Sequence, residues 1–167
     1  MKERAMPVTT AVRALRAARV SFIPHLYDYV EHGGTEHAAA SLCVSEHAVI
    51  KTLVMESREN GKKKVFLVLM HGDREVSTRQ LARLLDVKAV APVSESDVEK
   101  NTGYIPGGVS PFGTRMSLAV YVEETILEQG KICINGGKRG FLVEIEAAEL
   151  VRVLNAVPVR VAVNKGN

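Results

Sequence analysis

The chain has 167 residues, a length suited to one domain with one substantial hydrophobic core. Hydrophobic residues make up 46% of it and charged residues 25%, which are ordinary values for a globular protein. The net charge of +3 is too small to establish a nucleic-acid partner, and the longest purely apolar run, residues 65–70, is too short to span a bilayer.

The two cysteines, Cys43 and Cys133, lack C-x-x-C spacing, so the sequence predicts no zinc site, and both are expected to be buried. The N-terminal residues lack the continuous apolar segment of a secretory signal. We therefore expect one domain over residues 1–167 that is soluble and cytoplasmic, with reduced thiols. No metal, cofactor or membrane contact is expected.

The first part of the chain predicts two helices and a strand. Residues 7–19 predict a helix that Thr9 or Thr10 can cap, with arginines at every third position forming a basic face. The next two expected elements are a strand interrupted by Pro24 and a short helix capped by Thr35. They cover residues 21–29 and 35–42.

Residues 48–55 are predicted to form a strand, and this strand gives the most information about a possible site. Alternation places Val49, Leu53 and Met55 on one face together with Lys51, which is therefore a lone cation on an apolar face. Such a lysine must extend to solvent, form an ion pair or serve a pocket. An Asn-Gly turn then leads into residues 65–70, which are apolar at every position and should form a central strand.

The second half alternates short helices and strands. Helices are expected after Ser77 and after Ser94 or Ser96, where serine can cap the first turn, and again over residues 147–155. The expected strands are residues 117–122, 131–134, 141–145 and 157–163. Because strands and helices mix without regular βαβ alternation, we predict an α+β fold with a mixed, curved, barrel-like β-sheet flanked by helices.

Two glycine-rich segments give the strongest local indication of a site. Residues 102–113 contain four glycines and two prolines, and residues 135–140 contain three glycines and a Lys-Arg pair. Glycine lets a backbone approach a ligand closely, and proline fixes the neighbouring geometry. One such turn would be explained as a tight connection. Two of them favour a site, and we predict that they face each other across one pocket.

The usual catalytic patterns are missing from the sequence. The five histidines form no H-E-x-x-H motif, no G-x-S-x-G nucleophile elbow occurs, and the glycines before Lys138 lack the spacing of a phosphate-binding P-loop. The remaining features could bind a small polar group and an ester carbonyl through backbone donors. They offer little general-base chemistry.

Three motifs together resemble the YbaK/EbsC family. They are Val49-Ile50-Lys51-Thr52-Leu53, then Thr102-Gly103-Tyr104 with Gly107-Gly108-Val109-Ser110-Pro111, and finally Gly136-Gly137-Lys138-Arg139-Gly140. That family contains the bacterial Cys-tRNA(Pro) deacylases and is related to the editing domain of prolyl-tRNA synthetases. The resemblance covers nearly the whole chain, and the three motifs in this order are specific for the family.

The resemblance implies a trans-editing enzyme that hydrolyses the ester of mischarged Cys-tRNA(Pro), on a barrel-like mixed sheet flanked by helices. It implies that Lys51 meets the phosphate or ribose of the terminal adenosine and acts with Gly107 and Gly108. The other implied substrate contacts are Tyr27, Thr102, Tyr104, Ser110, Asn135, Gly136, Gly137, Lys138 and Arg139. The implied partners are mischarged tRNA(Pro) and prolyl-tRNA synthetase. In such deacylases the substrate's own thiol attacks the ester, in keeping with the lack of a protein nucleophile.

Two alternatives stay open at this stage. Many members of the family carry serine where this chain has Asn135, which keeps a donor and an acceptor but loses the hydroxyl, so the removed amino acid could be alanine or serine instead of cysteine. The same cleft could also hold a tRNA acceptor stem without hydrolysis, as a synthetase-associated binding module. A deacylation assay distinguishes the two classes.

Overall fold

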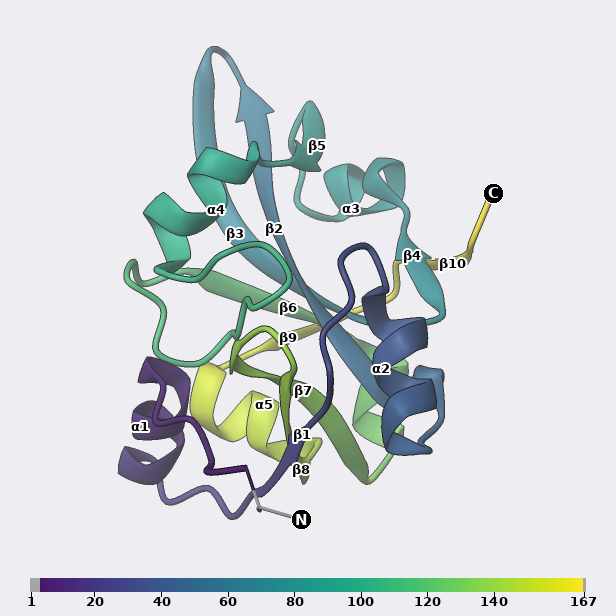
Figure 1. The fold of residues 1–167 in the computed structure, drawn as a ribbon. Helices are drawn as coiled ribbons and strands as arrows, with labels where there is room; N and C mark the ends of the chain where they lie inside the picture. The colour runs from purple at the N-terminus through teal and green to yellow at the C-terminus, as the bar shows by residue number, and fades with distance from the viewer. Residues whose placement is uncertain (1–3, 167) are drawn as a thin grey trace.

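The computed structural model describes residues 4–166, and its main feature is a mixed sheet of eight strands. The strands are β1 (Ile23–Leu26), β2 (Val49–Glu59), β3 (Lys62–His71), β5 (Ala89–Pro92), β6 (Ala119–Glu123), β7 (Lys131–Lys138), β8 (Phe141–Glu146) and β9 (Val157–Val159). Their order is β1-β8-β7-β2-β3-β6-β9, and β5 pairs with β2 outside this path (Figure 1). The mixed sheet flanked by helices confirms the predicted fold class, although the sheet stays open between its edge strands β1 and β9.

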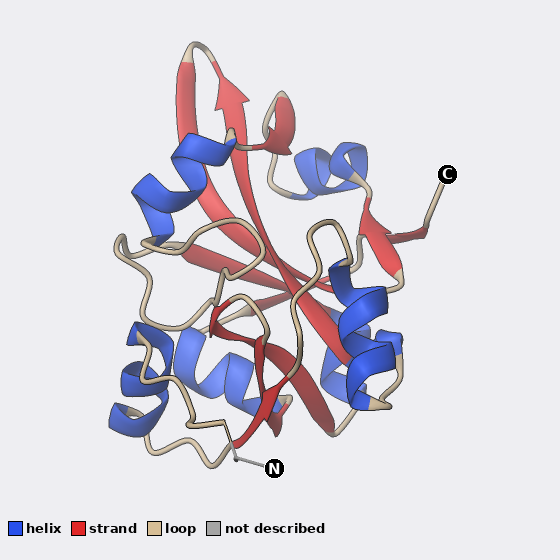
Figure 2. Cartoon of the chain, in the orientation of Figure 1, coloured by secondary structure: helices blue, strands red, loops and turns tan. Residues whose placement is uncertain are grey.

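Five helices cover the sheet, as Figure 2 shows. They are α1 (Thr10–Ala17), α2 (Gly34–Leu42), α3 (Thr78–Leu84), α4 (Glu95–Thr102) and α5 (Ala148–Leu154). The main core joins Val12 and Leu15 of α1 and Leu150 of α5 to inward-facing side chains of the sheet such as Leu67 and Phe141. Among residues 4–166, no helix is long and apolar enough to cross a membrane.

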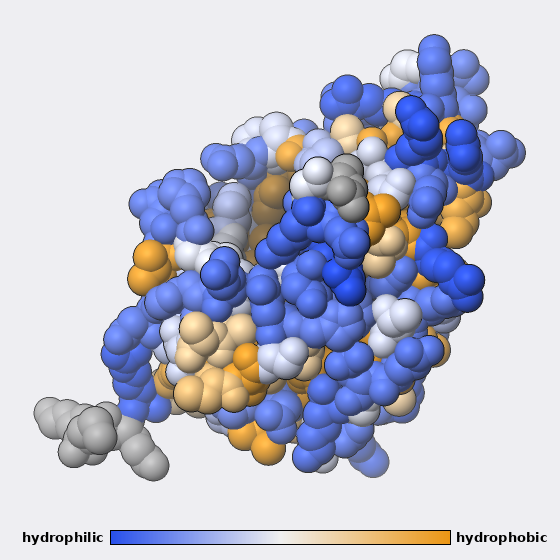
Figure 3. All heavy atoms as spheres, turned by 90° about the vertical axis from the view of Figure 1, so that its right-hand side faces the viewer, coloured by the Kyte–Doolittle hydropathy of each residue, from blue (hydrophilic) through white to orange (hydrophobic). Residues whose placement is uncertain are grey.

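Two smaller apolar clusters lie apart from the main core. One packs Leu81 of α3 against Met55 and Met70, and the other packs the alanines of α2 against Val49 and Leu142. Val49 and Met55 come from the same face of β2, as the alternation predicts, so Lys51 lies between the two clusters. Figure 3 shows that hydrophilic residues cover most of the molecular face on the side of α2 and α3, with apolar residues in small groups.

One edge of strand β2 is only partly paired with neighbouring strands. Its other edge pairs with β3 along Ile50–Glu59. On the incomplete edge, β7 pairs only with Val49 and Ile50, whereas β5 pairs only from Met55 to Arg58. Residues 51–54 are therefore not covered by a strand on that side within the described chain. This gap positions the site described below.

Several local predictions are confirmed. Thr9 caps α1, its side chain accepting a hydrogen bond from the Val12 N–H, and Ser77 and Ser94 cap α3 and α4 in the same way. Asn60 and Gly61 have φ of 51° and 76°, the left-handed values required by the predicted hairpin turn. Strand β3 is central, as its continuous apolar run indicates.

Other predictions are wrong for reasons of tertiary contact. Thr35 does not cap α2, because its hydroxyl lies within hydrogen-bond distance of Glu46 and of the Gly72 carbonyl instead. The expected last strand, residues 157–163, divides into β9 and β10 (Ala162–Asn164), and β10 pairs with β4 (Arg74–Val76) in a separate two-stranded sheet. The division occurs where the Glu123 carboxylate accepts the N–H groups of Val161 and Ala162.

Candidate functional site

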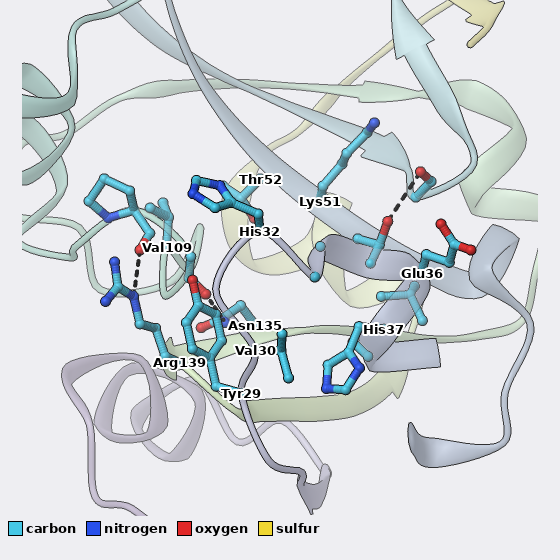
Figure 4. Close-up of a pocket in the computed structure, with 18 of the residues that line it drawn as sticks. Tyr29, Val30, His32, Glu36, His37, Lys51, Thr52, Val109, Asn135 and Arg139 are labelled. Carbon is cyan, nitrogen blue, oxygen red and sulfur yellow. Dashed lines mark hydrogen bonds between the residues drawn. The ribbon is translucent and has the colours of Figure 1, made fainter. Parts of the chain in front are cut away.

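A cleft of about 1000 Å³ opens beside the uncovered edge of β2. Its lining comes from β2, the loop before α2 with the start of α2, one side of α4, the first glycine-rich segment, and the end of β7 with the turn into β8, together with single residues such as Lys165. Lys51 and Thr52 from β2 line the same cleft as Tyr29, Asn135 and Arg139, and in Figure 4 the Lys51 side chain points away from the group formed by those three. These side chains come from distant parts of the sequence. They line one cleft because no strand occupies the space beside this part of β2.

Lys51 lines the cleft from the first position of the uncovered edge. Its ammonium group is half-buried, and this burial is the main cause that lowers its pKa below the ordinary lysine value. The positive charge of Lys165 lowers this pKa further, whereas Glu75, Glu46 and Asp73 act in the opposite direction. The lysine therefore lines a pocket.

The neighbouring Thr52 carries an unpaired polar atom. Its Oγ1 is buried and has no hydrogen-bond partner among residues 4–166, although the residue lines the cleft. A buried hydroxyl without a partner costs about 1–3 kcal/mol, so such atoms are rare unless a ligand or water completes them. Thr52 is a candidate substrate contact that the sequence reading did not single out.

Gly107 occupies a tight turn at the cleft wall. The Gly108 N–H donates to the Ile105 carbonyl at 2.9 Å, with Pro106 and Gly107 at the two central positions. Gly107 has a φ of +86°, which is the requirement of the third residue of a type II turn. A Cβ added to Gly107 would lie 2.7 Å from the Tyr29 Oη. The turn is therefore held against Tyr29 and leaves no room for a side chain.

The second glycine-rich segment is mostly strand. Strand β7 continues to Lys138, and the register shift between Asn135 and Lys138 makes Gly136 and Gly137 a bulge. The turn itself is limited to Arg139 and Gly140. The sequence prediction of one turn over residues 135–140 is therefore wrong for its first part, because the bulge keeps the chain paired with β8.

The two glycine-rich segments touch directly, so the prediction that they face each other across a pocket is wrong. The Asn135 Nδ2 donates to the Gly107 and Lys138 carbonyls at 3.2 Å each, and its Oδ1 accepts the Gly137 and Lys138 N–H groups at 2.6 and 3.1 Å. A serine hydroxyl, with its single donor, could not make this set of contacts. Asn135 therefore joins the two segments into one wall of the cleft.

Gly108 and Arg139 strengthen the same junction. A Cβ on Gly108 would lie 3.0 Å from the Arg139 backbone nitrogen, so the glycine allows two backbones to approach closely. The Arg139 Nε donates to the Pro106 carbonyl at 2.9 Å, and its guanidinium lies 5.1 Å from the centre of the Tyr29 ring. This distance is within the range of a cation–π contact.

The structure divides the predicted site residues into two groups. Lys51, Tyr27, Gly107, Asn135 and Arg139 line the cleft. The remaining residues are not among those that line it: Gly108, Thr102, Tyr104, Ser110, Gly136, Gly137 and Lys138. These seven lie behind or beside the wall.

Tyr104 and its neighbours support the first segment from behind. Tyr104 is buried, its hydroxyl donates to the Phe112 carbonyl, and burial raises its pKa to about 12. The fully buried Ser110 accepts the Phe112 N–H at 3.2 Å, and the Thr102 hydroxyl bonds to the Val98 carbonyl at 2.7 Å. These contacts fix the loop, and they leave the three side chains occupied within the protein.

Three aromatic or imidazole side chains in the cleft were not predicted. Tyr29 follows Tyr27, the tyrosine that the family resemblance implied, by two residues, and both line the cleft. His32 has a side chain 93% exposed, and its nearest acidic neighbour is Glu31 at 3.9 Å. His37 is oriented by the Asp28 carbonyl at 2.7 Å, with the Tyr27 ring 5.9 Å away.

One group of possible metal ligands lies close to the cleft, namely His47, His71 and Asp73. Both ring nitrogens of the buried His71 already have partners, the His47 carbonyl at 2.6 Å and the Thr125 Oγ1 at 2.7 Å. His47 bonds to Asp73 at 2.7 Å and stacks on His71 with ring centres 3.6 Å apart. These contacts explain why the three side chains lie together: they support the turn that contains Gly72.

A second group joins His25, Cys133 and Glu144. Burial, followed by the nearby Glu144 charge, raises the pKa of the Cys133 thiol to about 11, so it stays protonated and is a poor ligand or nucleophile. The prediction that Cys133 is buried is confirmed, whereas the same prediction for Cys43 is wrong. Cys43 ends α2 in a left-handed conformation, which places it at the exposed surface.

Comparisons with known proteins agree with this architecture. A model of the aminoacyl-tRNA editing domain matches residues 32–153. EbsC of Enterococcus faecalis, named as a candidate Cys-tRNA(Pro)/Cys-tRNA(Cys) deacylase, is 27% identical over 155 residues, which cover 92% of this chain and 93% of that protein. A proline–tRNA ligase of Limosilactobacillus fermentum is 30% identical over 98 residues, 58% of this chain but 17% of the ligase.

Solved structures share the fold over nearly the whole chain. The hypothetical protein APE2540 has a TM-score of 0.82 and 25% identity, covering 92% of this chain and 99% of that one. A candidate trans-editing enzyme for prolyl-tRNA synthetase has a TM-score of 0.79 and 21% identity, covering 97% and 100% of the two chains. The resemblance inferred from the three sequence motifs is thus confirmed.

The contact between Gly107 and Tyr29 can be tested through stability. Gly107→Ala and Gly61→Ala both place alanine at positive φ, which costs about 1–2 kcal/mol, but only Gly107 has a neighbour within contact distance. Gly107→Ala should therefore lower the free energy of unfolding more than Gly61→Ala in urea denaturation. Adding Tyr29→Phe, which removes the hydroxyl, should recover part of that difference. Equal losses for the two glycine variants would contradict the tight contact.

Proposed function

The chain belongs to the aminoacyl-tRNA editing domain family, and we propose on that basis that it hydrolyses the ester between a mischarged amino acid and its tRNA. The observation that carries the proposal is the half-buried Lys51 in the same cleft as the Gly107 turn. A cation can hold a nucleotide phosphate or ribose, while a rigid turn presents a backbone N–H to an ester carbonyl. These are the two ends that an aminoacylated terminal adenosine would offer.

Gly107 supplies the backbone donor in this account. Its N–H has no hydrogen-bond partner among the described residues, whereas the Gly108 N–H is occupied by the Ile105 carbonyl. We therefore assign the oxyanion contact to Gly107 alone and give Gly108 a packing role. The junction made by Asn135 and Arg139 holds this donor in place, so little reorganisation is needed when negative charge develops on the ester oxygen.

We propose cysteine as the amino acid removed, from tRNA(Pro), with prolyl-tRNA synthetase as the protein that presents the tRNA. EbsC, which is similar over most of the chain, is named for cysteinyl substrates, and a synthetase of the proline type contains a related segment. Neither cysteine of this chain lines the cleft. The nucleophile is then the thiol of the substrate itself.

The reaction balances without a protein nucleophile. The substrate sulfur attacks its own ester carbonyl, a cyclic thioester forms, and the ribose oxygen leaves with the proton that the thiol gives up. Water later opens the cyclic thioester to free cysteine. The contribution of the protein is to hold sulfur and carbonyl in a conformation from which attack can occur, because a flexible aminoacyl ester populates that conformation only in part when it is free in solution.

A second mechanism follows from His32. Its imidazole is exposed within the cleft, so it could activate water and allow hydrolysis of alanyl or seryl esters, which have no thiol. The test of the proposed function is to incubate the pure protein with a panel of aminoacyl-tRNAs and measure ester loss. Cysteinyl-tRNA(Pro) should be hydrolysed fastest. No loss of any ester would contradict enzyme function and favour the non-catalytic binding module.

Lys51→Ala should lower the rate of deacylation by at least about a hundredfold, because it removes a fixed cation from the site. The free energy of unfolding should stay the same or rise slightly, since a half-buried charge no longer has to be accommodated. Lys131→Ala, at an exposed position at the start of β7, is the matched control. Full activity of Lys51→Ala would show that the lysine is not part of the site.

Thr52→Val keeps the shape of the side chain and removes the unpaired hydroxyl. Stability should not fall, and could rise by about 1 kcal/mol, because a buried polar atom without a partner is lost. If the hydroxyl contacts substrate, the KM for aminoacyl-tRNA should rise. A variant with unchanged KM and kcat would remove Thr52 from the binding site.

The thiol mechanism predicts a distinct pattern across substrates and variants. S-methylcysteinyl-tRNA should resist cleavage, because its sulfur has no proton to give up and cannot form the cyclic thioester. His32→Ala, Cys43→Ser and Cys133→Ser should remain active on cysteinyl-tRNA. Rapid hydrolysis of alanyl-tRNA that is lost in His32→Ala would instead establish the water mechanism.

A further inference from the structure

A second lysine reaches the cleft from the other end of the sequence. Lys165 directly follows β10 and lines the same cleft as Lys51. Its ammonium group donates to the Glu46 Oε1 at 3.1 Å, and its side chain remains 47% exposed. Glu46 also accepts the Thr35 hydroxyl at 2.9 Å, so the lysine is held by a carboxylate that is itself fixed at the cleft wall.

The fold fixes the position of Lys165 through three contacts of the preceding residues. The buried Glu123 carboxylate accepts the N–H groups of Val161 and Ala162 at 3.0–3.2 Å, which bends the chain away from β9. Strand β10 then pairs with β4, and the Arg74 guanidinium donates to the Asn164 side chain at 2.6 Å. These contacts therefore hold the residues before Lys165 in a fixed position, which places Lys165 at the cleft.

This placement brings two like charges into one cleft. Burial is the largest cause that lowers the pKa of Lys51, and the positive charge of Lys165 is the second largest. No other charged group affects this pKa more than Lys165 does. Glu75, Glu46 and Asp73 offset the repulsion in part. Repulsion between fixed cations is unfavourable in the empty cleft, and the negative charge of a bound phosphate group would relieve it.

We propose that Lys165 is the second cation of a phosphate subsite, acting with Lys51 on the phosphate of the terminal nucleotide of tRNA. This inference rests on the proposed function and adds a residue outside the three sequence motifs. The two ammonium groups supply several donors to one phosphate, and Glu46 holds Lys165 ready when the cleft is empty. The ester end of the substrate then lies toward Gly107, away from the two lysines.

Binding of AMP to the full-length protein tests the subsite without requiring hydrolysis. Lys165→Gln should weaken AMP binding at least about fivefold, whereas Lys165→Arg, which keeps the charge, should bind nearly as well as the natural chain. Glu46→Gln removes the negative charge beside Lys165 but keeps a side-chain oxygen that can accept a hydrogen bond from its ammonium group, so it should not weaken AMP binding. Lys131→Gln, at an exposed site outside the cleft, controls for the loss of one charge.

The pH dependence of AMP affinity gives a second measurement. It should not change if Lys165 has only a structural role. AMP affinity should fall at alkaline pH as Lys51 loses its proton. Lys165→Gln removes a positive neighbour and so raises the pKa of Lys51, which should move this fall to higher pH. Glu46→Gln removes a negative neighbour and should move it to lower pH.

The outcomes separate this inference from the proposed function. Absence of AMP binding to the natural chain, or equal weakening by Lys165→Gln and Glu46→Gln, would overturn the two-lysine subsite even if the protein deacylates tRNA. AMP binding with the expected order of variants would support the subsite even if no aminoacyl-tRNA is hydrolysed.

Discussion

The gap along one edge of β2 is the constraint on which the rest of the site depends. Strand β7 pairs with the beginning of β2 and β5 with its end, so the residues between them have a strand on only one side. A continuous neighbour would have paired the backbone of residues 51–54 and occupied space beside that edge. With the gap, Lys51 and Thr52 line a cleft while their strand stays anchored to β3 along almost its full length. Such a scaffold holds a binding site on rigid structure.

The wall of the cleft is built by contact between two glycine-rich segments. The Asn135 amide uses both its donors and its acceptor to join them, and Arg139 bonds across to Pro106. Because Arg139 and Asn135 bond the carbonyls of Pro106 and Gly107, the peptide group that carries the Gly107 N–H has a defined orientation before substrate binds. A site with this rigidity and no evident nucleophile is suited to chemistry in which the substrate provides the attacking group.

Local features of the fold were predictable because they depend on neighbouring residues. The caps by Thr9, Ser77 and Ser94 and the turn at Asn60 are of this kind. The alternation along residues 48–55 also placed Lys51 correctly between apolar side chains. The resemblance of three motifs supplied the family, which periodicity and composition alone did not.

Long-range contacts set the limits of prediction. The sharing of one β2 edge by β7 and β5 depends on strand pairing that no local pattern encodes, and β5 itself was not predicted. Thr35 resembles a helix cap in sequence but bonds to Glu46, which becomes its neighbour only after folding. Lys165 lies far from every motif, and the bend at Glu123 that brings it to the cleft is visible only in the structure.

The central claim is that this cleft holds the aminoacylated end of a tRNA in one orientation. The most direct measurement is a crystal structure with a non-hydrolysable analogue, cysteine joined through an amide to the ribose of AMP. The account predicts the phosphate beside Lys51 and the amide carbonyl oxygen within hydrogen-bond distance of the Gly107 N–H. An analogue bound outside the cleft, or with its phosphate at the Gly107 turn and its amino acid at Lys51, would contradict it.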